Sequence, residues 1–348
     1  MRLILITGGI LLSGLASANC PIGVETARHA ELPLSSERPW KEISGVAVSR
    51  RFPDIVYVAS DGSDNGVAAV NINTGEHVAT YEMALDISPV DKEDLALGPC
   101  SPGSEKDCIF VGDIGDNRAK DTEGKDGRSV MRVYKFEEPD LPDDTVPVKV
   151  PTEVLSFRYK WGLGEGDDAP VRHNDSEAMF VDHASSDLYF LTKFKEGRRN
   201  VRLYRFPFTH QTKESYPVPV VSDSEFLRQH TWSRASYSFN GRLVAIGTDD
   251  ELWFFPVLDG MGIGEALAGE PCPFVMHRQC YGTPNLESVG FTADGKRIVE
   301  ISECGCERGR ACDHDRCTCP VPIWVSTLAM DALSAGGADD ADAQQDRE

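Results

Sequence analysis

The stretch that decides the fold reads Glu-Asp-Leu-Ala-Leu-Gly at residues 93–98 and Phe-Val-Gly-Asp-Ile-Gly-Asp-Asn at residues 110–117. A carboxylate stands directly before a short apolar run, and a second apolar run ends in further carboxylates. Short apolar runs bounded by Gly, Asp and Asn are typical of β-strands that end in turns. Weaker copies of the first half recur along the chain, so the stretch belongs to a repeat and points to a shared site.

Units of four short strands follow one another from Glu42 onwards. The expected strands are Ser44–Ser49, Ile55–Ser60, Val67–Ile72 and His77–Tyr81; Glu93–Gly98, Cys108–Gly112, Met131–Phe136 and Glu153–Tyr159; Glu177–Val181, Leu188–Phe194, Val201–Phe206 and Tyr216–Val221; Ala235–Phe239, Arg242–Gly247, Glu251–Val257 and Phe274–His277; and Glu287–Phe291, Arg297–Ser302 and Pro322–Ser326. A four-strand unit that repeats roughly every fifty to sixty residues is typical of a β-propeller, whose blades bury their faces against one another.

The sequence therefore predicts an all-β fold, a β-propeller of five four-stranded blades. The fifth unit is one strand short, and we expect the N-terminal segment before Glu42 to supply that strand and close the ring. Six blades is the alternative count, because the gap between the second and third units is long. The competing β-sandwich does not explain the recurring order of strand, turn and strand.

Residues 1–18 have the pattern of a cleaved secretory signal peptide. Met1-Arg2 is a short positive start, an apolar run extends from Leu3 to Leu15, and Ala16-Ser17-Ala18 is a small-x-small end. An uncleaved anchor is the alternative, but this run is too short to span a bilayer comfortably. No later apolar run approaches about twenty residues, so we expect no membrane span and a secreted protein, extracellular or periplasmic.

One β-propeller domain is expected over residues 19–331, with a cysteine-rich insertion at residues 303–320. The acidic tail at residues 332–348 is rich in Ala, Asp and Gln and is expected to be disordered. The formal net charge of -21 argues against binding of nucleic acid or of an anionic membrane surface. We expect a monomer whose acidic surface favours cations.

Ten cysteines fit an oxidising compartment and predict disulfide bonds. Cys100 with Cys108, and Cys272 with Cys280, each enclose seven residues, and we expect a local staple within each pair. The other six are expected to pair among themselves: Cys20, Cys304, Cys306, Cys312, Cys317 and Cys319. A zinc site built from the last five with the interleaved residues 313–315 is the alternative, less favoured in a secreted chain. Asn174 begins an N-glycosylation sequon, Asn-Asp-Ser, and is a candidate glycan acceptor.

Alignment of the five inner strands places one residue of each directly before the strand: Ser44, Glu93, Glu177, Ala235 and Glu287. Because inner strands line the central channel of a propeller, equivalent positions form a ring at one depth. Three of the five are glutamates, and converging carboxylates raise each other's pKa unless a cation neutralises them.

The sequence therefore predicts a divalent-cation site at the ring. Its candidate ligands are the three glutamates and four residues at the ends of second strands: Glu93, Glu177, Glu287, Asp61, Asp113, Asp116 and Asn117. Hard oxygen ligands suit Ca²⁺ or Mg²⁺ rather than Zn²⁺, and we favour Ca²⁺. The alternative is that the glutamates cap backbone N–H groups of adjacent blades.

Several of these stretches resemble a largely uncharacterised group of secreted bacterial β-propeller proteins that is loosely labelled WD40-like. The resemblance covers roughly residues 42–301 and rests on Glu42–Val46, Asn73–Gly75, Glu93–Ala96, Gly112–Asn117, Val133–Pro139 and Glu177–Met179, of which Gly112–Asn117 is the most specific. Two departures stand out: Lys92 replaces a common Trp, and Ser60–Ser63 replaces an Asn-Asp-Ser-Gly segment. The resemblance implies the fold and does not extend to the cysteines after Glu303.

A glutamate before an inner strand also resembles the architecture of the metal-dependent SMP-30-type lactonase propellers, and five-bladed glycoside hydrolases place three carboxylates at the channel mouth. The first likeness implies a metal that polarises a lactone or ester carbonyl and activates a water. No Gly-x-Ser-x-Gly motif is present, and no histidine pairs in sequence with a Ser or Cys nucleophile. We favour a module that binds a small molecule, a glycan or a protein over a metal-dependent hydrolase of lactones, esters or glycosides.

Overall fold

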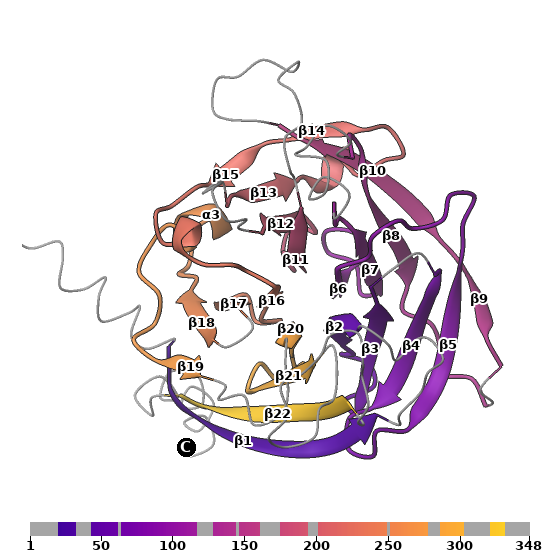
Figure 1. Cartoon of the computed structure of the whole chain (residues 1–348), viewed down its shortest axis with the longest axis horizontal. Coiled ribbons are helices and arrows are strands. Elements are labelled where there is room, and N and C mark those ends of the chain that lie inside the picture. The colour runs from indigo at the N-terminus through magenta and orange to yellow at the C-terminus, as the bar shows by residue number, and fades with distance from the viewer. Residues whose placement is uncertain are drawn as a thin grey trace, which may run out of the picture.

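Five β-sheets surround a common axis and form the blades of a propeller (Figure 1). The computed structural model describes residues 20–32, 43–61, 64–116, 128–143, 146–160, 175–193, 201–248, 251–277, 286–302 and 321–330. The inner strands contact one another in the cyclic order β2, β6, β11, β16, β20 and back to β2. The prediction of an all-β propeller with five blades is confirmed.

Each blade is an antiparallel sheet of four strands, from the axis outwards. Blade 1 is β2 (Ile43–Val48), β3 (Ile55–Ser60), β4 (Gly66–Asn71) and β5 (His77–Ala84); blade 2 is β6 (Asp94–Pro99), β7 (Asp107–Asp113), β8 (Met131–Glu137) and β10 (Glu153–Tyr159); blade 3 is β11 (Ser176–Val181), β12 (Leu188–Thr192), β13 (Leu203–Phe206) and β15 (Val220–Ser222); blade 4 is β16 (Arg234–Tyr237), β17 (Leu243–Gly247), β18 (Glu251–Pro256) and β19 (Val275–His277); blade 5 is β20 (Leu286–Phe291), β21 (Arg297–Ser302), β22 (Val321–Met330) and β1 (Pro21–Leu32). The described helices are short: η1 (Phe208–His210), η2 (Leu227–Gln229) and α3 (Ile263–Ala266). None of these helices has the length and apolar character needed to cross a bilayer.

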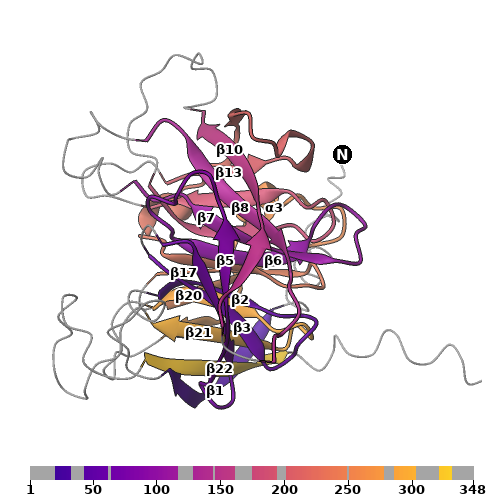
Figure 2. The ribbon, with the colours of Figure 1, turned by 90° about the vertical axis from the view of Figure 1, so that its right-hand side faces the viewer.

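The N-terminal strand closes the ring, as expected. Strand β1 pairs antiparallel with β22, from Pro21 opposite Met330 to Leu32 opposite Val321. Figures 1 and 2 both show β1 lying along β22 at the outer edge of blade 5. Blade 5 is therefore built from both ends of the chain, which ties those ends into one sheet.

Two extra strands cross between blades, which the sequence did not predict. Strand β9 (Val148–Pro151) lies between β8 and β10 in the chain but pairs parallel with β5 of blade 1. Strand β14 (Tyr216–Val218) pairs parallel with β10 of blade 2, whereas β15 pairs with β13 of blade 3. The predicted strand Tyr216–Val221 is thus divided at Pro219, which has no N–H group to continue a ladder.

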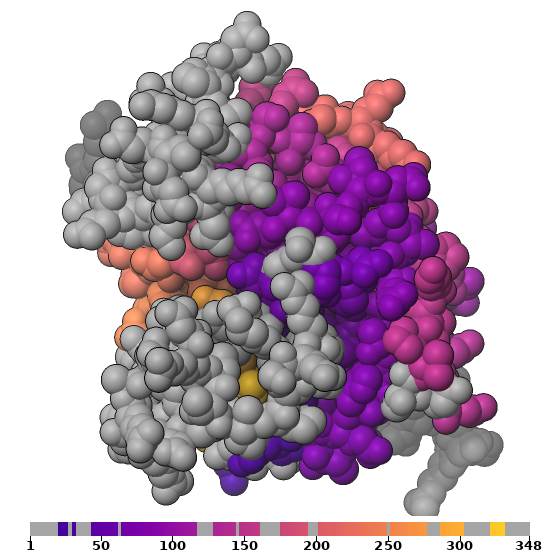
Figure 3. Space-filling view, turned by 45° about the vertical axis from the view of Figure 1, so that its right-hand side comes forward, coloured from indigo at the N-terminus to yellow at the C-terminus, as the bar shows by residue number. Residues whose placement is uncertain are grey.

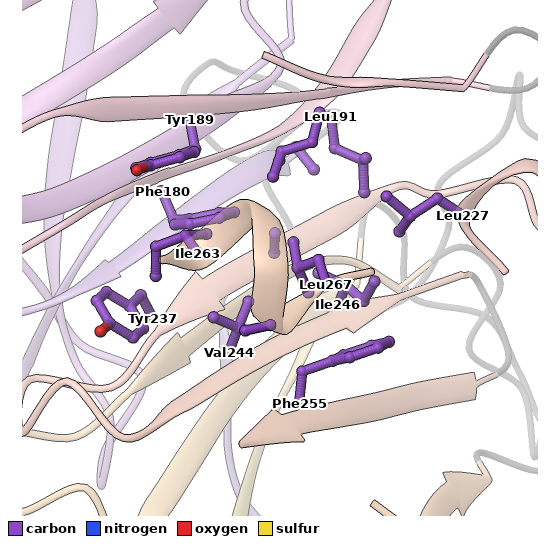
Figure 4. Close-up of a cluster of buried hydrophobic side chains, with 14 of the residues drawn as sticks. Phe180, Tyr189, Leu191, Leu227, Tyr237, Val244, Ile246, Phe255, Ile263 and Leu267 are labelled. Carbon is purple, nitrogen blue, oxygen red and sulfur yellow. The ribbon is translucent and has the colours of Figure 1, made fainter. Parts of the chain in front are cut away.

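Within the described part of the chain, the hydrophobic core forms five clusters, one at each interface between neighbouring blades. Alternate residues of a strand enter different clusters: Leu95 and Leu97 of β6 face blade 1, and Ala96 faces blade 3. The interface between blades 3 and 4 also receives Ile263 and Leu267, which point from α3 and the residue after it into the cluster of Figure 4. Blades 1 and 2 form one continuous surface from indigo to magenta in Figure 3.

Two disulfide bonds lie in the described part of the chain. Cys100 and Cys108 are joined across the hairpin of β6 and β7, with Cα atoms 4.8 Å apart, which confirms the predicted local staple. Cys20 is joined to Cys272, with Cα atoms 5.5 Å apart.

The predicted pairing of Cys272 with Cys280 is therefore wrong, and so is the assignment of Cys20 to the C-terminal group. Cys20 directly precedes β1, and the pairing of β1 with β22 brings it to the interface of blades 4 and 5, where Cys272 is held by the bond from its N–H to the Phe254 carbonyl. The other cysteines lie outside the described residues: Cys280, Cys304, Cys306, Cys312, Cys317 and Cys319.

The Cys20–Cys272 bond is expected to contribute more stability than the Cys100–Cys108 bond. The first spans 252 residues and the second spans 8. Loop-closure entropy predicts losses of about 5.5 and about 2.5 kcal/mol in unfolding free energy when each bond is removed. The measurement is urea-induced unfolding of the double variants Cys20→Ser/Cys272→Ser and Cys100→Ser/Cys108→Ser. Equal losses, or a larger loss for the hairpin bond, would contradict the expectation that the Cys20–Cys272 bond stabilises the closed ring more than the hairpin bond does.

Candidate metal centre

The inner strands bring the predicted ring together at one end of the channel. The ladders of β2, β11 and β20 each skip one residue, which leaves Ser44, Glu177 and Glu287 as bulges at equivalent positions. Glu93 stands at the same place directly before β6 and donates its N–H to Gly112 O. Because a bulge re-aims a side chain out of the ladder, these side chains leave the sheets at the same level of the channel.

The fifth member of the ring is Ser233, not the predicted Ala235. Arg234 pairs with Gly247 as Asp94 pairs with Gly112, and Ser233 N–H donates to Gly247 O as Glu93 N–H does to Gly112 O. The sequence alignment missed this position because Ser233 and Arg234 are polar, so the apolar run of β16 begins only at Ala235. Arg234 is fully buried, and its guanidinium lies 3.4 Å from the carboxylate of Glu300 in blade 5.

Four carboxylates gather around Glu93. We call this end of the channel the carboxylate mouth, and its five carboxylates are Asp61, Asp91, Glu93, Asp175 and Glu177. They form two groups, one of Asp61, Asp91 and Glu93 and one of Glu93, Asp175 and Glu177, and within each group one oxygen per residue lies within 4.8 Å of the others. Asp61 and Asp91 are half-buried and the other three are buried. The structure thus unites three predicted ligands and adds two, Asp91 and Asp175, that the sequence did not indicate.

Glu93 is the member common to both groups, and its side chain is 3 % exposed. The hydroxyl of Ser44 donates to Glu93 O at 2.7 Å and to its Oε2 atom at 3.3 Å. Among the described residues, no hydrogen-bond donor reaches Oε1 of Glu93. A buried charged oxygen without a partner is costly, because nothing replaces the water that it has lost.

The other two predicted aspartates position the mouth. Oδ1 of Asp113 accepts hydrogen bonds from the N–H groups of Val90 (3.0 Å) and Asp91 (2.9 Å), and Oδ2 pairs with Arg128 at 2.8 Å. Asp116 donates its N–H to Oδ1 of Asp175 at 2.6 Å and accepts from Arg128 N–H. These contacts hold Asp91 and Asp175 in place. Asn117 and Asn174 lie outside the described residues.

Gly115 explains why the acidic run contains a glycine at this place. A Cβ atom there would lie 2.2 Å from Oε1 of Glu93 and 2.6 Å from Oδ2 of Asp91. Real Cβ atoms do not approach other atoms so closely, so any other residue at position 115 would displace both carboxylates. The absence of a side chain is what allows two carboxylate oxygens to converge on the backbone.

Lys193 belongs to the mouth, and the sequence did not indicate it. Its Nζ atom lies 2.8 Å from Oε1 of Glu177. Lys193 and Asp61 occupy equivalent positions in their blades. Each directly follows the second strand, whose last residue, Thr192 or Ser60, pairs with the residue before the bulge of the inner strand. The sequence predicted a strand over Leu188–Phe194, which includes Lys193. A strand that ends at Thr192, as β12 does, would have placed Lys193 at the same level as the carboxylates. Glu287 is half-buried, and its charge acts on Lys193.

The electrostatics of the mouth favour neutralisation. Burial, followed by the charges of Glu177, Asp61, Asp91 and Asp175, raises the pKa of Glu93 well above its usual range. Burial also raises the pKa of Glu177 to about 7, although Lys193 opposes the shift. Burial lowers the pKa of Lys193, but Glu177, Glu287 and Glu93 outweigh it and raise that pKa. Uptake of protons or cations therefore stabilises Glu93 and Glu177.

The opposite end of the channel is plugged by side chains. Phe239 lies against His183, with ring centroids 4.6 Å apart, and the Arg50 guanidinium lies 5.2 Å from the Phe239 centroid. The cavity among the inner strands at this end holds about 20 Å³, room for a single water at most.

No protein-family model matches this chain, and no curated protein matches it. Among solved structures it is similar to a PQQ-bound aldose sugar dehydrogenase from Streptomyces coelicolor (TM-score 0.44, 13 % identity, 88 % of this chain and 100 % of that one). It is also similar to a luciferin-regenerating enzyme (0.41, 10 %, 88 % and 95 %) and to U3-55K (0.37, 13 %, 82 % and 68 %). Similarity at this level carries no argument about chemistry.

Acidification is expected to weaken the plug at His183. Its Nε2 atom lies 3.2 Å from the Tyr237 carbonyl oxygen, and burial lowers the pKa of His183 to about 4, against about 6.5 in the unfolded chain. Below pH 6.5 the unfolded state binds the proton more readily, so stability should fall between about pH 6.5 and pH 4. Urea unfolding of the native protein and of His183→Gln across this range should give a free-energy difference that shrinks as the pH falls. Parallel pH profiles would contradict this assignment.

Proposed function

We propose that this protein is a secreted β-propeller that binds a divalent cation at its carboxylate mouth and serves there as a ligand- or protein-binding module. The propeller fold and the two acidic groups are the basis of this proposal. Two disulfide bonds fit an extracellular or periplasmic protein. The resemblance to secreted bacterial propellers points the same way.

One observation carries the proposal: the buried Glu93 carboxylate, whose Oε1 atom has no hydrogen-bond donor among the described residues, faces four further carboxylates. Lys193 supplies one positive charge to this group through Glu177. A bound divalent cation would supply the missing partner of Glu93 and would offset the repulsion from the carboxylates around it.

The ligand set favours Ca²⁺ over Mg²⁺. Ca²⁺ accepts six to eight oxygen ligands at 2.3–2.6 Å in flexible geometry, whereas Mg²⁺ keeps several waters and uses one or two carboxylates. Three carboxylates whose oxygens lie within 4.8 Å of one another fit a single Ca²⁺ sphere. Zn²⁺ prefers His and Cys ligands, and neither residue type belongs to the two groups.

A cation held in this way would leave coordination positions open toward the mouth, because three carboxylates do not fill a sphere of six to eight oxygens. Oxygen-rich ligands would complete it: a glycan, a small carboxylate or an acidic side chain of a partner protein. The half-buried Asp61 and Asp91 place one side of the group near solvent. We therefore expect ligand binding to require the cation.

A second candidate is a metal-dependent hydrolase of lactones, esters or glycosides at the same mouth. The observation that favours it is the pKa of Glu177, about 7, because a group that titrates near neutral pH is suited to proton transfer. In this case the cation would polarise a carbonyl or lower the pKa of a bound water. Binding is preferred, because Glu177 is paired with Lys193 and no second acid or base is assigned.

Calcium is expected to stabilise the folded protein. At a Ca²⁺ concentration 100 times the dissociation constant, the unfolding free energy should rise by about 2.7 kcal/mol. For a chain of this size the melting temperature should rise by about 4 °C. The measurement is thermal unfolding with Ca²⁺ and with chelator, for the native protein and for Glu93→Gln, which should lose most of the shift. The absence of both a shift and a metal in the purified native protein would contradict the proposal.

The same two proteins separate the candidate functions. Lactone, phosphate-ester and glycoside substrates are offered to each in the presence of Ca²⁺. Turnover by the native protein that disappears in Glu93→Gln would favour the hydrolase. Calcium-dependent stabilisation without turnover of any of these classes would favour the binding module.

A further inference from the structure

We infer that the carboxylate mouth is a two-cation centre in which Glu93 is the shared ligand. One subsite is formed by Glu93, Asp175 and Glu177, and the other by Asp61, Asp91 and Glu93. This inference rests on the proposed function, since it requires the mouth to bind cations at all, and adds a second, oxygen-ligated divalent cation to it.

The geometry of the two groups separates the subsites. In each group the three oxygens lie within 4.8 Å of one another. Two oxygens on opposite sides of one Ca²⁺, each about 2.4 Å from the ion, are separated by about the same distance. Glu93 is the one member that the groups share among the described residues. The oxygens of Asp61 and Asp91 do not form one such group with those of Asp175 and Glu177, so a single cation sphere does not hold all five.

The position of blade 2 in the ring explains the arrangement. Strand β6 lies between β2 of blade 1 and β11 of blade 3. Asp61 follows the second strand of blade 1, Asp175 directly precedes the inner strand of blade 3, and Glu177 belongs to that strand. Glu93 is therefore approached by carboxylates from both neighbouring blades, and a carboxylate has two oxygens with which to bridge two cations.

Glu93 itself has the features of a bridging ligand. It is 3 % exposed, and its Oε1 atom has no hydrogen-bond donor among the described residues. The Ser44 hydroxyl contacts Oε2 at 3.3 Å and leaves Oε1 available to a cation. Gly115 leaves the approach to Oε1 of Glu93 and Oδ2 of Asp91 clear of any side chain.

The stoichiometry of Ca²⁺ binding tests the inference on the full chain. Isothermal titration of chelator-treated protein should give two Ca²⁺ per chain for the native protein and for Asp223→Asn, a control at an exposed carboxylate beyond β15. Asp61→Asn/Asp91→Asn should remove one of the two, and Asp175→Asn/Glu177→Gln should remove the other. One Ca²⁺ per native chain would overturn the two-cation centre and leave the proposed function standing, whereas no Ca²⁺ at all would remove both. Two Ca²⁺ retained in either double variant would also overturn it.

Electron paramagnetic resonance with Mn²⁺ provides a readout that needs no variant. Two Mn²⁺ ions bridged by one carboxylate lie about 3.5–4 Å apart, as in other two-metal centres, and their spins should couple. We expect a coupled spectrum at two Mn²⁺ per native chain. Two bound ions with the spectrum of isolated Mn²⁺ would show that Glu93 does not bridge them and would overturn the inference.

Discussion

Burial of both faces of every sheet is the constraint on which this structure depends. In β3, β7, β12 and β17 all residues are buried, because each strand sends alternate side chains into two different interfaces. Only toward the rim does a strand such as β5 alternate between buried and half-exposed positions. A sheet of this kind is stable only between two neighbours, so the ring has to close. Strand β1 meets this requirement by completing blade 5 beside β22.

Closure of the ring is also what creates the carboxylate mouth. The five inner strands begin at one level around a common axis, so residues that lie far apart in the chain converge there. Asp61 comes from blade 1, Glu93 from blade 2 and Glu177 from blade 3. The unfolded chain would leave these carboxylates solvated and apart. The free energy that holds them together comes from the five apolar clusters, and part of it is opposed by their repulsion.

Much of the fold could be read from the sequence, because the strand period and the turn residues are local signals. The equivalence of Ser44, Glu93, Glu177 and Glu287 followed from aligning the units. Contacts between distant parts of the chain could not be predicted from these local signals. Cys20 meets Cys272 only because β1 pairs along the whole of β22. Asp91 and Asp175 lie outside the strands and carry no pattern of their own. They lie in the mouth because residues of blade 2 bind them: Asp113 accepts a hydrogen bond from the Asp91 N–H, and the Asp116 N–H donates to the Asp175 carboxylate.

The most specific motif of the sequence, Gly112–Asn117, therefore acts as a support in its described part. Both oxygens of Asp113 are engaged by protein groups, and Asp116 links Asp175 to Arg128. An aspartate with these contacts orients other ligands better than it could bind a cation, because each hydrogen bond would have to be replaced. The glycine between them is required for the opposite reason, since Gly115 must present no side chain to Glu93. A motif can thus mark a candidate metal centre through the residues that shape it, while the candidate ligands, Asp61, Asp91, Glu93, Asp175 and Glu177, are spread over three blades.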